Sequence, residues 1–117
     1  MRDEIKLFLP LSPAELHILL ALAGEDLHGY GIMIEVARQS GGQYKLGPGT
    51  LYDNLRKLLT QGCVEEMQKR AAGEDPRRRY YRLTALGRRV LAAEVARLET
   101  VVRDAKAYLV GPRPRRA

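Results

Sequence analysis

Apolar residues recur at helical spacing through the first half of the chain and predict three helices. The first begins at Ser12-Pro13-Ala14-Glu15. There a hydroxyl at the N-cap, a proline at the first helical position and a glutamate three residues after the serine satisfy the free amides of a new helix. The following apolar residues repeat at helical spacing: Leu16, Leu19, Leu20 and Ala23. We expect a helix over roughly 12–23 that ends at Gly24 in a left-handed C-cap.

The second predicted helix opens at His28-Gly29-Tyr30-Gly31 and stops at Ser40-Gly41-Gly42. Three apolar side chains share one face of it, and three more widen the apolar coverage: Tyr30, Ile34 and Ala37, then Ile32, Met33 and Val36. A glycine within a helix costs about 1 kcal/mol relative to alanine, so Gly31 suggests a close approach to a neighbouring element.

The third predicted helix follows the loop Leu46-Gly47-Pro48-Gly49, with Thr50 as the candidate N-cap and Gly62 as the stop. Its apolar stripe consists of Leu51, Leu55, Leu58 and Leu59. At about 100° per residue, this stripe leaves several polar residues pointing away from the core or along its border. They are Asp53, Arg56, Lys57 and Thr60 on the outer face, and Thr50, Tyr52, Asn54 and Gln61 on the border.

A β-hairpin and a long helix complete the pattern. Val64 to Gln68 and Tyr80 to Leu83 have strand-forming residues. The connection between them is long, and residues 69–82 carry six Lys or Arg against two acidic residues, a local net charge of +4. Thr84 then caps a helix whose apolar stripe runs for about 25 residues to Leu109, nearly 40 Å at about 1.5 Å per residue. A three-helix domain cannot cover such a helix alone, so part of the stripe needs another partner.

Composition narrows the class of protein. The 117 residues are 45% apolar, which is enough for one core, and the formal net charge is +6, which favours a polyanionic partner. The N-terminus has no signal-peptide pattern, and no apolar run spans a bilayer, so we expect a cytoplasmic protein.

The single Cys63 indicates a buried thiol rather than a disulfide framework. His17 and His28 lack a third metal ligand at a sensible spacing, and no nucleophile or acid-base pair is recognisable, so the sequence predicts neither a cofactor, nor a metal, nor an enzyme.

Three helices followed by a hairpin with a basic loop is the order of a winged helix-turn-helix, in which the third helix enters the major groove of DNA and the wing follows the backbone. We therefore expect a mostly α fold with a small β-hairpin and a long C-terminal helix. The expected parts are a winged helix-turn-helix DNA-binding domain over 1–83, a C-terminal dimerisation helix over 84–110 and a disordered basic tail over 111–117.

Candidate DNA-contacting residues lie before and on the third helix and around the wing. They are Lys45, Thr50, Tyr52, Asn54, Arg56, Lys57, Arg70, Arg77, Arg78 and Arg79. Each also has a plainer interpretation: a helix cap for Thr50, a core-border ring for Tyr52, and a solvated surface for the charged residues. The candidate dimerisation residues are Leu91, Leu98, Val101, Val102, Ala105 and Leu109.

From about Leu11 to Leu109 the chain resembles the PadR family, through segments that occur in the family's order. These are Leu16 to Leu22, His28-Gly29-Tyr30, Gly49-Thr50-Leu51-Tyr52 with Leu55 and Leu58-Leu59, Gly62-Cys63-Val64-Glu65, and Arg79 to Gly87. The resemblance implies a cytoplasmic bacterial repressor that dimerises through its C-terminal helix and leaves its operator when a small-molecule effector binds or conditions change. The single long helix resembles the short subgroup.

The resemblance does not extend to a ligand. Some short relatives bind flat aromatic drugs between tryptophans, and this chain has no Trp. Tyr108 and Phe8 are the aromatic residues left to line an interface cavity. Two other functions fit the same elements: a protein-interaction adaptor whose basic wing binds an acidic partner, and a non-specific DNA-binding protein.

Overall fold

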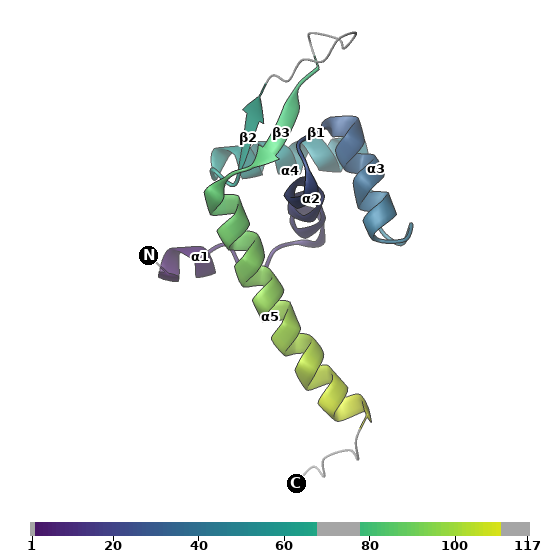
Figure 1. Ribbon diagram of the computed structural model, residues 1–117, viewed down its shortest axis with the longest axis vertical. Helices are drawn as coiled ribbons and strands as arrows, with labels where there is room; N and C mark the ends of the chain where they lie inside the picture. The colour runs from purple at the N-terminus through teal and green to yellow at the C-terminus, as the bar shows by residue number, and fades with distance from the viewer. Residues whose placement is uncertain (1, 68–77, 111–117) are drawn as a thin grey trace.

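The computed structural model describes residues 2–67 and 78–110, and Figure 1 shows their arrangement. The elements, in chain order, are α1 (Arg2–Lys6), α2 (Pro13–Gly24), β1 (Leu27–His28), α3 (Gly29–Gln39), α4 (Pro48–Thr60), β2 (Val64–Met67), β3 (Tyr80–Leu83) and α5 (Ala85–Val110). The predicted fold class is confirmed: the protein is mostly helical, with a small antiparallel sheet and a long C-terminal helix. Helix α1 was not predicted.

Helix α2 begins where its capping box predicts. The Ser12 hydroxyl accepts a hydrogen bond from the Glu15 amide at 3.1 Å, and the Glu15 carboxylate accepts one from the Ser12 amide at 2.8 Å. The predicted left-handed cap at Gly24 is wrong, because the chain leaves the helix through Glu25 in an extended conformation and passes directly into β1.

The sheet has three strands in the order β1-β3-β2, all antiparallel. Strand β3 lies in the centre, so Tyr81 pairs with Leu27 on one side and with Glu66 on the other. The hairpin of β2 and β3 was predicted, whereas β1 was not. A strand of two residues has no alternation that a sequence could reveal.

Helix α3 buries only part of the apolar coverage that its sequence shows. Tyr30 and Ile34 are 64% and 51% exposed, while Ile32 and Val36 are fully buried. Apolar residues extend around more than half of this helix, so periodicity alone could not choose the buried face, and packing against α2 and α4 decides it. The close approach predicted at Gly31 occurs instead at Gly29, as described below.

Helix α4 begins at Pro48 with Gly47 as its N-cap, so the predicted cap at Thr50 is wrong. Proline is suited to the first turn because its missing amide would have had no partner there. Thr50 lies inside the helix, and its carbonyl accepts a hydrogen bond from the Asn54 side chain at 2.8 Å. The predicted stop at Gly62 is confirmed, with a positive φ of 82°.

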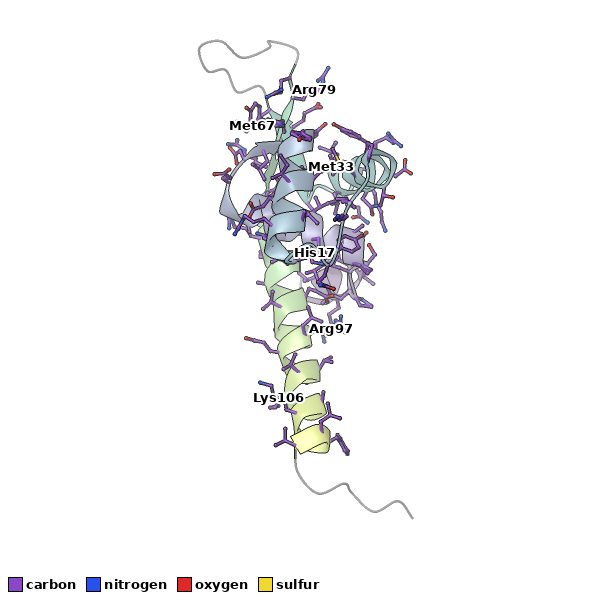
Figure 2. All side chains as sticks on the ribbon, turned by 90° about the vertical axis from the view of Figure 1, so that its right-hand side faces the viewer. His17, Met33, Met67, Arg79, Arg97 and Lys106 are labelled. Atoms are coloured by element: carbon purple, nitrogen blue, oxygen red, sulfur yellow. The ribbon has the colours of Figure 1, made fainter. Side chains whose placement is uncertain are left out.

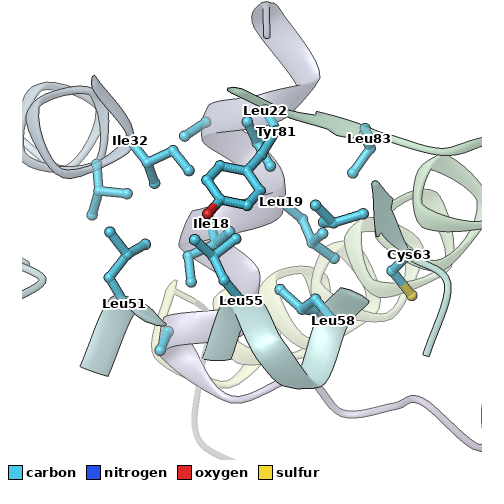
Figure 3. Close-up of a cluster of buried hydrophobic side chains, with 14 of the residues drawn as sticks. Ile18, Leu19, Leu22, Ile32, Leu51, Leu55, Leu58, Cys63, Tyr81 and Leu83 are labelled. Atoms are coloured by element: carbon cyan, nitrogen blue, oxygen red, sulfur yellow. The ribbon is translucent and has the colours of Figure 1, made fainter. Parts of the chain in front are cut away.

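The core lies around α2, which packs against α3, α4, α5 and β3. Figure 3 shows side chains of α2, α4 and β3 meeting there, with Tyr81 among them. Cys63 is fully buried, and burial raises the pKa of its thiol, as expected for an inert core cysteine.

Helix α5 is divided between the core and solvent. The Thr84 hydroxyl accepts a hydrogen bond from the Gly87 amide at 3.0 Å, which confirms the predicted cap. Val90, Leu91 and Glu94 are buried, so the first half of α5 belongs to the folded body. Its second half, with Lys106, extends away from the other elements (Figures 1 and 2). None of the described helices is long and apolar enough to cross a membrane. The predicted tail over 111–117 lies outside the described residues.

Candidate nucleic-acid interface

The outer face of α4 is exposed and polar. Some of its side chains form an ion pair or a hydrogen bond within the helix. Arg56 forms an ion pair with Asp53 one turn earlier, and both side chains are largely exposed. Asn54 is half-buried and donates to the Thr50 carbonyl. Lys45, in the preceding loop, is exposed. The helix therefore presents a partly ordered set of donors and acceptors to solvent, which is what base-edge contacts in a groove require.

Lys57 differs from its neighbours on this helix because it has a buried partner. Its ammonium lies 2.7 Å from the Glu15 carboxylate, whose side chain is 7% exposed. Burial alone would raise the pKa of Glu15, but hydrogen bonds from Lys57 and Ser12 outweigh it and leave this pKa below its ordinary value. The Lys57 side chain thus links α4 to the first turn of α2 through an ion pair.

Tyr52 lies at the border of the outer face, 41% exposed, with its phenol against the first residue of α3. A Cβ placed on Gly29 would be 2.1 Å from the Tyr52 hydroxyl oxygen, so a larger residue at position 29 would displace this ring from its observed position. The position of Tyr52 therefore depends on α3 as well as on its own helix.

Two of the four predicted wing arginines are described. The Arg79 guanidinium lies 3.3 Å from the Glu66 carboxylate on β2, and the Arg78 guanidinium lies 3.3 Å from Nε2 of His28. Both residues lie directly before β3, and Figure 2 shows Arg79 at the base of the wing. Arg70 and Arg77 lie outside the described residues.

A hollow of about 390 Å³ lies where the start of α3, the side of α4 and the base of the wing meet. It is lined by His28, Gly29, Tyr30, Tyr52, Arg78, Arg79 and Tyr81. The sequence singled out Tyr52, Arg78 and Arg79 for DNA contact but not the other four. The run His28-Gly29-Tyr30 was predicted as the start of a helix and as a family segment, not as part of a site. The sequence predicted the pairing of β3 with β2 but not its pairing with β1, which brings Tyr81 beside Leu27.

His28 and His17 have structural partners. Nδ1 of His28 accepts a hydrogen bond from the Gly31 amide at 3.0 Å and so caps α3, while its ring meets that of Tyr80 edge-on. His17 stacks on Tyr44 with ring centroids 4.6 Å apart. Within residues 2–67 and 78–110, no three His, Cys, Asp or Glu residues are grouped so that they could hold a metal ion.

The candidate dimerisation residues divide into two groups. Leu91 is 8% exposed and packs into the core of its own chain. Leu98 is half-buried, and the remaining candidates, Val101, Val102, Ala105 and Leu109, are exposed. Val95, which was not among the candidates, joins Leu98 and Val102 in an apolar groove along this half of α5.

Comparisons with known proteins agree with this geometry. Residues 18–93, more than half of the chain, match the family described as Transcriptional regulator PadR-like family. The transcriptional regulator Rv3488 of Mycobacterium tuberculosis is 35% identical over 89 residues, covering 76% of this chain and 78% of that protein.

Two solved structures show the same fold. A transcriptional regulator from Clostridium thermocellum has a TM-score of 0.70 at 23% identity, over 93% of this chain and 97% of that one. Bacillus subtilis PadR, solved in complex with operator DNA, has a TM-score of 0.62 at 22% identity, over 74% of this chain and 48% of that one.

Proposed function

The chain belongs to the PadR-like family of transcriptional regulators, and from this premise we propose that it is a repressor that binds a palindromic operator as a homodimer. Members of this family regulate transcription by binding DNA, which agrees with the prediction that the chain is not an enzyme. The observation that carries the proposal is the shared hollow, because Tyr52 of α4 and Arg78 and Arg79 of the wing line it together. A recognition helix and a wing that meet in this way can follow one DNA strand from the major groove onto the backbone.

The DNA-contacting residues in this proposal divide by task. Base-edge contacts come from the outer face of α4, through Thr50, Tyr52, Asn54 and Arg56. Backbone contacts come from Lys45 and from the wing arginines, Arg70, Arg77, Arg78 and Arg79. Lys57 joins them only as a secondary contact, because Glu15 already holds its ammonium. Cations on the backbone contribute affinity that falls with salt, whereas the face of α4 contributes sequence preference.

The homodimer in this proposal forms through the second half of α5, over the stripe that includes Leu98, Val101, Val102, Ala105 and Leu109. The exposure of these apolar residues on a helix that extends from the body supports it. Two copies related by a twofold axis would present two α4 helices, and a palindromic site follows from that symmetry.

Release by a small-molecule effector stays a prediction. Of the two aromatic residues considered for an interface cavity, Phe8 packs against the core and Tyr108 is 61% exposed near the end of α5. In the proposed dimer, Tyr108 is the one whose surroundings would change on association. An effector bound there would act on the spacing of the two α4 helices.

The test is fluorescence anisotropy with the DNA site that the protein selects from a random-sequence library, compared with a scrambled duplex of equal length at two salt concentrations. A preference of about a thousandfold that persists at the higher salt supports a specific regulator. Equal, salt-sensitive binding to both duplexes would instead indicate a non-specific DNA-binding protein. No DNA binding at low salt would indicate the adaptor function.

A further inference from the structure

We infer that the second half of α5 pairs with the same segment of a second copy in an antiparallel orientation, with Glu99 of each copy facing Lys106 of the partner subunit. This inference rests on the proposed function, and it adds to the homodimer the direction of the two helices, their register and two ion pairs between the copies. Burial along α5 sets the direction, and the charges that border its apolar stripe set the register.

The apolar residues in the second half of α5 have the spacing of a coiled coil. Val95, Leu98, Val102, Ala105 and Leu109 are separated alternately by three and by four residues. This spacing keeps one side of a helix against one partner helix. Val102 and Leu109 are 50% and 83% exposed, so the described part of the chain leaves them largely uncovered. The stripe therefore suits a second helix packed along it.

The first half of α5 determines the direction of that second helix. Val90, Leu91 and Glu94 are buried against the body of their own chain. At about 100° per residue, Leu91 points within about 20° of Leu98 and Leu109, so the body occupies the same side of α5 that the stripe continues. Figure 1 shows the second half of α5 extending past the body.

This shared side excludes a parallel pair on steric grounds. Each body lies on the side of α5 that is directed toward the partner, over the segment that contains Leu91 and Glu94. Two parallel helices would bring both bodies to the same end of the pair, where each would occupy the space of the other. An antiparallel pair places the bodies at opposite ends, so only the free second halves meet.

The charges beside the stripe favour the same direction. Glu99 and Lys106 line the apolar groove along α5 on one side of the stripe, while Arg103 points further from it. In an antiparallel pair, this side of one helix faces the same side of the other, so Glu99 meets the partner's Lys106, and symmetry repeats the contact. In a parallel pair, Glu99 would instead face the partner's Glu94, a charge of the same sign.

The same ion pairs determine the register. When Glu99 lies beside the partner's Lys106, Val102 faces the partner's Ala105, and the twofold axis passes between positions 103 and 104. The next antiparallel register would set Glu99 against the partner's Glu99. It would also require the partner's tip to pack on Leu91, which is only 8% exposed because its own core covers it. Charge and available surface therefore favour one register.

The other side of the stripe is apolar in this register. Val101 and Tyr108 are 49% and 61% exposed, and they lie on the side of the stripe opposite Glu99. With the register given above, Val101 of each copy lies beside the partner's Tyr108. The pair thus has a charged border and an apolar border, and both consist of matching residues.

Distances between nitroxide labels on the full-length protein test the direction and the register. Ala96→Cys and Arg103→Cys place labels at exposed positions on the same side of α5, and the native Cys63 is buried. In the inferred pair the two copies of the label should be separated along the helix axis by about 22 Å at position 96 and about 2 Å at position 103. The next register gives about 12 Å and about 9 Å, and parallel helices give equal distances at both positions.

A charge exchange tests the ion pairs. Lys106→Glu and Glu99→Lys should each weaken dimerisation by about tenfold at low salt, because each change makes two attractive pairs repulsive. The double variant should recover most of the parent's dimer affinity. The two positions are about 10 Å apart along one helix, so the recovery would come from contacts between copies. Ala107→Glu is the control, since it adds a negative charge on the exposed outer side and should leave dimerisation unchanged.

Sedimentation equilibrium measures these affinities, and circular dichroism verifies the helix content of each variant. Equal label distances at positions 96 and 103, or a double variant that dimerises no better than the single ones, would overturn the antiparallel pair while the homodimer stands. A monomeric parent would overturn both. A parent with the expected distances that selects no DNA from a random library would leave the antiparallel pair in place and contradict the proposed repressor.

Discussion

Leu11 and Glu94, which are 83 positions apart in the chain, are joined by a hydrogen bond of 3.2 Å from the Leu11 amide to the Glu94 carboxylate. The same carboxylate forms an ion pair of 2.7 Å with Arg97 and is 1% exposed. This contact ties the segment before α2 to the middle of α5, at the point where the helix leaves the body. The proposed dimerisation helix is thereby fixed in direction relative to the DNA-binding part.

Replacing Glu94 by Ala should lower the free energy of unfolding by about 1–3 kcal/mol, because a buried amide and a guanidinium lose their acceptor. Glu35→Ala is the matched control. Glu35 pairs with Arg38 at the same three-residue spacing, but its side chain is 26% exposed, against 1% for Glu94, and the Arg38 side chain is 69% exposed. Glu35→Ala should cost no more than about 0.5 kcal/mol. Urea unfolding of the three proteins measures both effects, and equal losses would contradict the role given to Glu94.

The stabilisation from Glu94 should depend on pH. The hydrogen bond from Arg97 outweighs burial and holds the pKa of Glu94 below its ordinary value of 4.5. A carboxylate with a lowered pKa in the folded state contributes its full stabilisation above the unfolded value and loses it as the pH falls through the folded value. The difference in unfolding free energy between the parent and Glu94→Ala should therefore be constant near neutral pH and shrink below about pH 4.5. If the difference in unfolding free energy instead grew as the pH fell, it would contradict a lowered pKa of Glu94 in the folded protein.

Lys57 and Arg56 are adjacent on α4, yet their substitution by Met should have different effects. Lys57→Met leaves the buried Glu15 carboxylate without its cation and should lower stability by about 1–2 kcal/mol. Arg56→Met removes an exposed pair and should leave stability within about 0.5 kcal/mol while weakening DNA binding. Thermal unfolding measures the stability of the two variants, and fluorescence anisotropy on the selected duplex measures their DNA affinity. A larger loss of DNA affinity in Lys57→Met than in Arg56→Met, without a stability loss, would reverse these assignments.

The sequence predicted features whose causes are local. The capping box at Ser12 and Glu15 and the threonine cap at Thr84 act within one helical turn, so their residues reveal them. The hollow could not be predicted in the same way. Its residues come from β1, α3, α4, β3 and the two positions before β3. Strand β1 positions His28 beside Tyr80 through pairing that depends on tertiary structure. The same reason explains why the sequence did not identify the buried face of α3, since packing against neighbouring helices selects it.

Gly87 is in contact with the backbone of the turn before β2. A Cβ there would lie 2.1 Å from the Cys63 carbonyl oxygen and 2.9 Å from Leu83, and a backbone group can move less than a side-chain tip. Gly87→Ala should therefore destabilise the protein by about 3 kcal/mol. Gly24→Ala, where nothing lies within 4 Å of the added carbon, should change stability by no more than about 0.5 kcal/mol. Similar melting temperatures for the two variants would contradict the close approach.

The proposed dimer is tested on the exposed half of α5. Val102 is 50% exposed and lines the apolar groove with Val95 and Leu98. The substitution Val102→Asp would place one negative charge from each copy at the proposed twofold interface, where the two charges repel. The Val102→Asp variant should therefore be monomeric at micromolar concentration. Thr100→Asp, on the opposite side of the same helix, adds the same charge and should remain dimeric. Sedimentation velocity gives the masses.

The DNA affinity of the same two variants connects the dimer to the function. A monomer contacts one half-site, so Val102→Asp should bind the selected palindrome more weakly, by a factor of about a hundred or more, and should not distinguish it from an isolated half-site. Circular dichroism verifies that α5 remains helical in both variants. A parent protein that is monomeric, or a Val102→Asp variant that still dimerises while Thr100→Asp does not, would place the interface elsewhere on the molecule.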